Sequence, residues 1–348
     1  MFLDFFGLRE QPFGVTPDPR YLYLGPGHRE ALASLYYGIE ANRGFLSLIA
    51  RPGMGKTTLL FHLLAKFDHT ARTAFLFQTQ CSSREFMRFL LAEIGIESDS
   101  QDFVRMHEQF NRCLVQEARA GRRFIVVIDE AQNLDPSVLE TVRLLSDFET
   151  PQAKLLQIVL VGQPGLADKL AKPALTQLRQ RITSVSGLSP LNADETGKFI
   201  AHRLKVAGYT GESLFTPEAL QLIAQVSEGI PRQVNNYCFH ALSLACAMRQ
   251  KTVDAAMVRE VMHDLDIHRF VSDVGNPSLR HLEVGGGSSD PFQPVEELTE
   301  TGRAYLDSKS TPDENESLSP AEAIEHMRDV ARLLHNWRAG SGRTGQPA

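Results

Sequence analysis

The feature that most constrains the fold is a glycine-containing loop between an apolar run and a helical pattern. The run Phe45–Ile49 precedes the loop, and helical spacing continues after it over Leu59–Ala65. The loop reads Ala50-Arg51-Pro52-Gly53-Met54-Gly55-Lys56-Thr57-Thr58. A glycine loop that leads from a strand into a helix favours phosphate, because backbone N–H groups and the helix dipole both attract an anion. We therefore predict a P-loop that binds ATP, in which Lys56 neutralises phosphate charge and Thr57 ligates Mg²⁺.

The loop departs from the usual G-x-x-x-x-G-K-[ST] pattern at its first position, which is Ala50. If this position needs a positive φ, alanine costs roughly 1–2 kcal/mol, which corresponds to about a five- to thirtyfold loss of affinity. If Ala50 is simply the end of the strand, the substitution costs almost nothing. The sequence leaves both possibilities open.

A second apolar run ends in two carboxylates. Phe124–Ile128 is followed directly by Asp129 and Glu130. Carboxylates are costly inside a protein unless they are paired or bind a metal, so their place after a buried strand calls for a cation. We expect Asp129 to hold the Mg²⁺ shell and Glu130 to orient and deprotonate the attacking water.

Short apolar runs alternate with helical patterns through the first half of the 348-residue chain. The predicted strands are Phe45–Ile49, Ala74–Phe77, Phe124–Ile128, Leu156–Val161 and Ile182–Val185. Mostly apolar strands separated by helices are typical of a parallel sheet that is buried on both faces. The fold class predicted is therefore α/β, a P-loop NTPase with a parallel sheet, and the family resemblance given below implies the additional-strand, catalytic-glutamate class.

The pattern becomes all-helical after about residue 190. We predict helices at Asp194–Val206, Pro217–Val226, Arg232–Met248 and Ala255–Met262. The expected organisation is an α/β domain over 1–190 and a helical lid domain over 191–268, and the family resemblance given below implies that residues 1–43 lie near the nucleotide. Residues 269–318 are rich in Gly, Ser, Pro and acids, which predicts a flexible linker.

A last helix is predicted at 319–340. Ser319-Pro320-Ala321-Glu322 is a capping box with proline at the first helical position. Its apolar residues share one face: Ile324, Met327, Ala331, Leu334 and Trp337. This face either packs on its own chain or binds a protein partner, and the sequence favours neither.

Composition limits the classes of protein that remain. The formal net charge of −6 argues against a globally basic nucleic-acid-binding protein, so DNA is a possible but not a favoured partner. The four cysteines form no CxxC pair, which makes a zinc site or disulfide framework improbable. The N-terminus lacks the basic region of a signal peptide, and no apolar stretch approaches the ~20 residues of a membrane span. We expect a cytoplasmic protein.

Several motifs resemble one family in order and spacing. They are the P-loop, Asp129-Glu130-Ala131-Gln132, Gly162-Gln163-Pro164, Leu178-Arg179-Gln180-Arg181 and Gly229-Ile230-Pro231-Arg232. Together with the N-terminal Phe5-Phe6-Gly7-Leu8, they resemble AAA+ ATPases of the ExeA, or general secretion pathway protein A, type over about residues 1–268. The resemblance implies that Gln163 is sensor 1 and Arg232 is sensor 2. It also implies that Arg179 or Arg181 is an arginine finger reaching the ATP of a neighbouring subunit, so a homo-oligomer is expected.

Three functions remain open at this point. The first is an ATP-hydrolysing AAA+ protein that couples nucleotide state to assembly and partner remodelling, in secretion or envelope and polysaccharide export. The second is an ATPase resembling DNA-binding transposition regulators, for which a local basic patch is offered either by Arg119, Arg122 and Arg123 or by Arg84 and Arg88. The third is a nucleotide switch that does not hydrolyse ATP, against which the intact Glu130 argues.

Overall fold

The sheet of this protein has five parallel strands in the order β2-β3-β4-β1-β5. The computed structural model describes residues 2–77, 80–97, 102–149 and 154–274, with the side chains of 266–274 excepted. The strands are β1 (Phe45–Ile49), β2 (Ala71–Leu76), β3 (Arg123–Ile128), β4 (Gln157–Gly162) and β5 (Ile182–Gly187). The predicted α/β fold class is therefore confirmed.

The strand order brings three loops to one edge of the sheet. Strand β4 lies between β1 and β3, which is the insertion that defines the additional-strand class. In the register, Ile49 pairs with Gly162, and Ile128 pairs with Leu160. Because the strands are parallel, the residues that follow β1, β3 and β4 emerge side by side.

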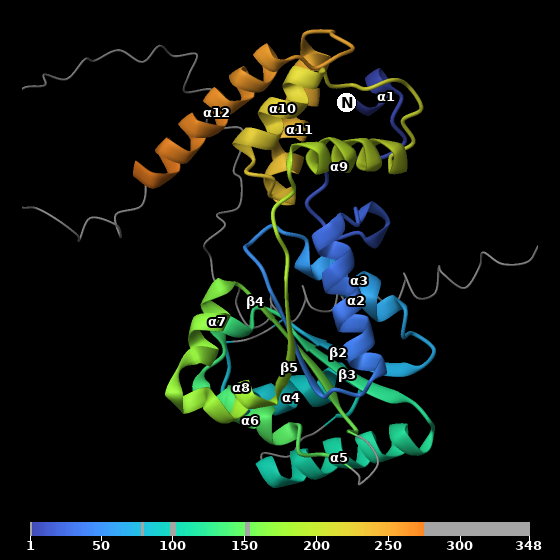
Figure 1. Cartoon of the computed structure of the whole chain (residues 1–348), viewed down its shortest axis with the longest axis vertical. Coiled ribbons are helices and arrows are strands. Elements are labelled where there is room, and N and C mark those ends of the chain that lie inside the picture. Colours follow the sequence, from blue (N-terminus) through green and yellow to red (C-terminus); the bar gives the residue numbers. More distant parts are fainter. Residues whose placement is uncertain (1, 78–79, 98–101, 150–153, 275–348) are drawn as a thin grey trace, which may run out of the picture. The chain divides into compact units, whose positions relative to one another are not determined.

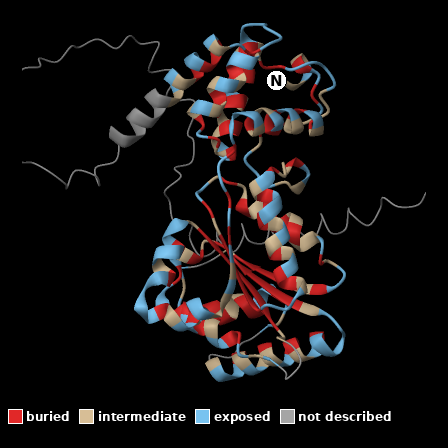
Figure 2. Cartoon of the chain, in the orientation of Figure 1, coloured by how far each residue is buried: buried red, intermediate tan, exposed pale blue. Residues whose placement is uncertain are grey.

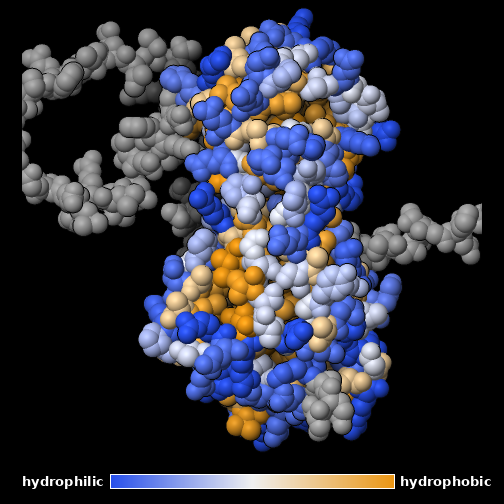
Figure 3. Space-filling view, in the orientation of Figure 1, coloured by the Kyte–Doolittle hydropathy of each residue, from blue (hydrophilic) through white to orange (hydrophobic). Residues whose placement is uncertain are grey.

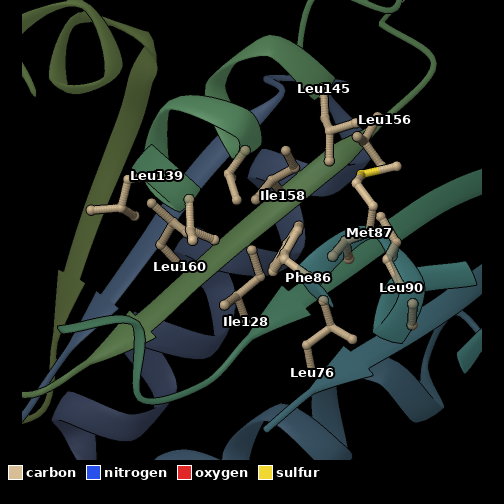
Figure 4. Packing of buried hydrophobic residues seen from close by; sticks show 14 of the residues in the cluster. Leu76, Phe86, Met87, Leu90, Ile128, Leu139, Leu145, Leu156, Ile158 and Leu160 are labelled. Atoms are coloured by element: carbon tan, nitrogen blue, oxygen red, sulfur yellow. The ribbon is translucent and has the colours of Figure 1, made fainter. Parts of the chain in front are cut away.

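Helices lie on both faces of the sheet (Figure 1). They are α2 (Pro26–Glu40), α3 (Lys56–Ala65), α4 (Ser83–Glu93), α5 (Phe103–Arg119), α6 (Pro136–Leu145), α7 (Pro164–Ala171) and α8 (Thr176–Arg181), with short 3₁₀ turns at Ala131–Asn133 and Pro173–Leu175. Figure 2 shows that strands β1, β3 and β4 are almost wholly buried, whereas most residues of the edge strand β5 are exposed or half-buried. Leu76, Ile128 and Ile158 of the sheet pack against Phe86 of α4 and Leu139 of α6 (Figure 4).

The helices after β5 form a second hydrophobic core. They are α9 (Ala193–Val206), α10 (Pro217–Val226), α11 (Pro231–Ala247) and α12 (Ala255–Val274). A capping box at Asn192 and Glu195 begins α9, because each side chain bonds the backbone N–H of the other residue. Among the described residues, this core is separate from the one that packs against the sheet.

The N-terminal segment packs into this second core. It contains α1 (Phe2–Phe6) and a 3₁₀ turn at Pro19–Tyr21. The rings of Phe2 and Phe239 meet edge to face at 5.7 Å between centroids. Residues 2–21, grouped above with the α/β domain, are thus joined to the helices of the lid by long-range contacts that sequence spacing does not reveal.

The C-terminal predictions fall mostly outside the described residues. Helix α12 continues to Val274, so it extends into the segment predicted as a linker from residue 269. The contacts place residues 1–278 in a first unit and 279–348 in a second. The rest of the predicted linker and the predicted helix at 319–340 lie outside the residues that the structure describes.

Candidate functional site

The P-loop connects the end of β1 to the first residue of α3. Gly53 and Gly55 have φ of 76° and 83°, a backbone conformation that glycine adopts without a Cβ penalty. Ala50 is not among the described residues with positive φ, and its buried N–H donates to the carbonyl oxygen of Gly162 at 3.1 Å. Alanine at this position therefore causes no left-handed backbone strain, because it continues the pairing of β1 with β4.

Lys56 is held inside the loop. Its side chain is buried, and Nζ donates to the carbonyl oxygens of Ala50 at 3.2 Å and Arg51 at 3.4 Å. A buried ammonium group needs such acceptors, since an unpaired charge is costly inside a protein. The loop thus presents a positive charge together with the free N–H groups at the start of α3.

Thr57 and Asp129 provide two oxygen ligands side by side. The hydroxyl Oγ1 of Thr57 donates to Oδ2 of Asp129 at 3.0 Å. Burial raises the pKa of Asp129, and the nearby Glu130 carboxylate adds to this effect, although the Glu130 N–H and the Thr57 hydroxyl oppose it. Mg²⁺ prefers oxygen ligands, and in nucleotide sites it takes one or two carboxylates while phosphates and water complete its shell. The pair fits that requirement.

Glu130, the second residue after β3, has a left-handed conformation with φ of 49°. Its N–H donates to Oδ1 of Asp129 at 2.9 Å. Two amide groups hold its carboxylate: Gln163 Nε2 donates to Oε2 at 3.0 Å, and Gln132 Nε2 donates to the same oxygen. A left-handed backbone at a non-glycine residue costs free energy, and such residues are enriched at functional sites.

Sequence reasoning did not select Gln132 as a site residue. Its Oε1 accepts the backbone N–H of Gln163 at 3.0 Å, so its side chain links Glu130 to the end of β4. The signal in the sequence is its place in the family motif Asp129-Glu130-Ala131-Gln132, two residues after the acidic pair. The predicted sensor 1 residue, Gln163, therefore contacts Glu130 directly and together with Gln132 fixes its orientation.

Arg232 meets the P-loop from the helical part. It is the second residue of α11, and its N–H donates to the carbonyl oxygen of Gly53 at 3.1 Å. Its side chain lines the same cleft as Lys56 and Glu130. The structure thus brings the predicted sensor 2 residue to the phosphate loop.

The cleft between the P-loop and the helical part has a volume of about 510 Å³. Residues 14–18 and 21–23 line it, with Leu191, Phe199 and Arg203. His28 also lines it, and Nε2 lies 3.0 Å from the carbonyl oxygen of Met54. Because a carbonyl oxygen only accepts, Nε2 of His28 carries the proton. Burial lowers the pKa of this imidazole, which favours the neutral form.

The two candidate finger residues lie elsewhere, on α8. Neither lines the cleft of its own chain. Arg181 donates to Ser146 Oγ at 2.6 Å and forms an ion pair with Asp147. Arg179 is exposed, and its side chain has no hydrogen-bond or ion-pair partner within the described part of the chain. The structure therefore separates two arginines that the sequence could not distinguish.

The fold and the site define an AAA+ P-loop ATPase domain, and the comparisons agree. Residues 39–170 match a family model described as an AAA domain. The fold is similar to that of Cdc6p from Pyrobaculum aerophilum, with a TM-score of 0.58 at 19% identity, covering 73% of this chain and 70% of that one. The ORC2 protein of Aeropyrum pernix gives the same TM-score at 18% identity, covering 72% and 71%.

The family follows from a sequence relative. The chain is 40% identical over 254 residues to general secretion pathway protein A of Aeromonas hydrophila, covering 71% of this chain and 45% of that protein. Its AAA+ region therefore belongs to the general secretion pathway protein A type, as the motifs predicted. The chain spans less than half the length of that relative. It is also 27% identical to an uncharacterized HTH-type transcriptional regulator of Methanocaldococcus jannaschii, covering 73% and 69%.

None of the helices in the described part of the chain is both long enough and apolar enough to cross a bilayer.

Proposed function

We propose that this protein binds ATP with Mg²⁺ in the cleft and hydrolyses it. The observation that carries the proposal is the meeting of three loops: Lys56 and Thr57 after β1, the Asp129–Glu130 pair after β3, and Gln163 after β4. Thr57 and Asp129 would hold Mg²⁺, which neutralises phosphate charge when it is bound. Lys56 and the N-terminus of α3 bind the β- and γ-phosphates.

Glu130 acts as the base for the attacking water. Both amide donors bond Oε2, so Oε1 is the oxygen left to accept the proton of the water. The water oxygen then bonds the γ-phosphorus while the bond to the bridging oxygen of ADP breaks. The products are ADP and phosphate, and the backbone of Glu130 need not move because its side chain is already oriented.

The test is phosphate release from MgATP by the wild type, Lys56→Ala and Glu130→Gln. We expect Lys56→Ala to lose nucleotide binding. Glu130→Gln should bind ATP as the wild type does but hydrolyse it at least a hundredfold more slowly, as expected for loss of a general base. A wild type that binds ATP yet releases phosphate no faster than Glu130→Gln at high protein concentration would leave a non-hydrolysing switch as the function.

We further propose that hydrolysis requires a homo-oligomer, with Arg179 as the finger. Arg179 lies exposed on α8 and away from its own cleft, whereas the Arg181 side chain is bound to Ser146 and Asp147. Figure 3 shows hydrophobic residues gathered on the surface between α7 and β5, next to α8. An apolar surface beside an exposed arginine supports packing of a second copy there.

The process proposed is secretion or envelope assembly in the cytoplasm, where ATP is available. Its support is the relative named for the general secretion pathway. The domain division at about residue 190 and a C-terminal partner-binding helix at 319–340 belong to the same proposal. Co-purification of the protein with secretion components would support this part of the proposal. Deletion of residues 319–340 should abolish that co-purification.

DNA binding is the second candidate, because one relative is named as an HTH-type transcriptional regulator. Two arginines of the predicted basic patch are occupied, however: Arg122 bonds Glu117 at 2.6 Å and Arg123 bonds Glu40 at 2.9 Å. Salt-dependent DNA binding in the presence of ATP would establish this function, since phosphate contacts release counterions.

A further inference from the structure

A buried amide in the cleft has an acceptor atom that nothing in the described chain satisfies. Asn235 is 9% exposed, and its Oδ1 has no hydrogen-bond partner within the part of the chain that the structure describes. Its side chain lines the cleft together with that of Arg232. The two residues are three apart on α11, so they lie on one face of the helix.

An unsatisfied buried amide is unusual in a well-packed protein. Leaving a buried acceptor without a donor costs about 1–3 kcal/mol, and most such groups find a partner in the protein or in water. An unsatisfied acceptor on a residue that lines a ligand cleft is explained when the ligand supplies the missing donor. Asn235 therefore indicates a ligand with an N–H or O–H group at this position.

The surroundings of Asn235 fit a flat ring. Tyr23, Leu191 and Phe199 line the same cleft and provide aromatic and apolar surface. The Arg203 guanidinium lies 4.8 Å from the Tyr21 ring centroid, and it donates to the carbonyl oxygens of Pro12 and Gly14. Its donors thus hold the N-terminal segment against the cleft. The amide of Asn235 belongs to the same cleft, and its donor and acceptor can both pair with the edge of a ring.

We propose that Asn235 selects adenine over other bases, an inference that rests on the proposed ATP binding. An asparagine amide matches adenine in two places, because Oδ1 accepts from the exocyclic amino group while Nδ2 donates to a ring nitrogen. Guanine and hypoxanthine carry a carbonyl oxygen at C6 instead. With these bases, an acceptor oxygen lies opposite the acceptor Oδ1 of Asn235. The buried amide oxygen therefore still lacks a hydrogen-bond donor.

The test compares nucleotides that differ at one group. Equilibrium binding is measured for ATP, ITP, GTP, purine riboside triphosphate and 2′-deoxyATP, each with Mg²⁺. The variants are Asn235→Ala and the closer in volume Asn235→Leu, with thermal unfolding of each without nucleotide to establish folding. Asn236→Ala is the matched control, because it removes the same amide from the next residue, which does not line the cleft.

The wild type should bind ATP at least about tenfold more tightly than ITP, GTP or purine riboside triphosphate, which is the effect of one buried hydrogen bond of about 1.4 kcal/mol. Both Asn235 variants should bind ATP about tenfold more weakly than the wild type and bind ITP with almost unchanged affinity. The ratio of the dissociation constant for ITP to that for ATP should therefore fall toward one. Asn236→Ala should keep the wild-type ratio.

Three results would overturn the assignment. A wild type that binds ATP and ITP equally has no base selection to explain. An equal loss of ATP and ITP in the Asn235 variants means that the residue shapes the cleft without reading the base. A loss that disappears with 2′-deoxyATP assigns the contact to the ribose. Failure of the wild type to bind any nucleotide would instead overturn the proposed function, and the inference with it.

Discussion

The backbone N–H of Arg232 donates to the carbonyl oxygen of Gly53 at 3.1 Å, so the first turn of α11 is bonded directly to the phosphate loop. The two residues are also packed closely: a Cβ added to Gly53 would lie 2.7 Å from Cβ of Arg232. The added Cβ would also lie 3.2 Å from Cγ2 of Ile230. The position of the helix that carries Arg232 and Asn235 therefore depends on the absence of a side chain at Gly53.

Gly53→Ala should weaken nucleotide binding by about tenfold or more. The left-handed conformation costs alanine roughly 1–2 kcal/mol, and the new methyl group must displace Arg232 and Ile230. Gly121→Ala is the control, because Gly121 has a similar φ of 70° but nothing within 4 Å of the added Cβ. Both variants should unfold at a lower temperature than the wild type. Calorimetric titration with ATP should separate them, and equal affinity in the two variants would contradict the proposed contact.

Asp129→Asn should stabilise the metal-free protein at neutral pH. Burial raises the pKa of Asp129 above its unfolded value, so the folded state binds more protons between these two values. Stability is therefore lost as pH rises from the unfolded pKa through the folded pKa, and it stays lost above that. Asparagine removes this loss.

The same variant should lose the added stability that MgATP gives the wild type, because the carboxylate ligand is gone. The measurement is the free energy of unfolding against pH, with and without MgATP. A wild-type protein whose stability rises with pH through this window, with no such rise in Asp129→Asn, would show that the carboxylate is favourable without metal.

His28→Leu should lower stability by about 1 kcal/mol, the value of one hydrogen bond, and should weaken ATP binding, because Met54 belongs to the P-loop. Burial lowers the pKa of His28, so the unfolded state binds the extra proton and stability falls as pH drops through the unfolded pKa near 6.5. His28→Gln retains an N–H donor and should keep most of the stability while losing this part of the pH dependence. Denaturant unfolding at pH 5.5 and 7.5 would check both results.

The sheet could be predicted because its strands are apolar runs between helical patterns. The run Phe45–Ile49 matches β1 in full. Strand β2 begins earlier than predicted, at Ala71. The sequence did not reveal this start because Arg72 interrupts the apolar pattern. Arg72 bonds the buried carboxylate of Glu117 at 3.0 Å, a contact across 45 residues that no local pattern contains. The docking of residues 2–21 on the lid helices was missed for the same reason.

The site residues also fall into two groups, those that local sequence patterns predict and those whose role depends on contacts between distant parts of the chain. Motif spacing placed Lys56, Asp129 and Glu130, since parallel strand ends must meet at one edge. Gln132 was missed because its role depends on a side-chain bond to β4. Asn235 was missed because burial without a partner is a property of packing, which a sequence does not display.

Arg179 should act on the ATP of another subunit, and mixing inactive variants tests this directly. Arg179→Ala should bind ATP normally but hydrolyse it about 10³-fold more slowly, since an arginine that stabilises transition-state charge has an effect of this order. Mixed with Lys56→Ala, it should regain part of the activity, because an intact P-loop on one subunit meets Arg179 of the other. Arg181→Ala should instead lower thermal stability through loss of the Asp147 ion pair and keep its own activity. If the mixture stays inactive while the two variants co-assemble, Arg179 is not a finger in trans.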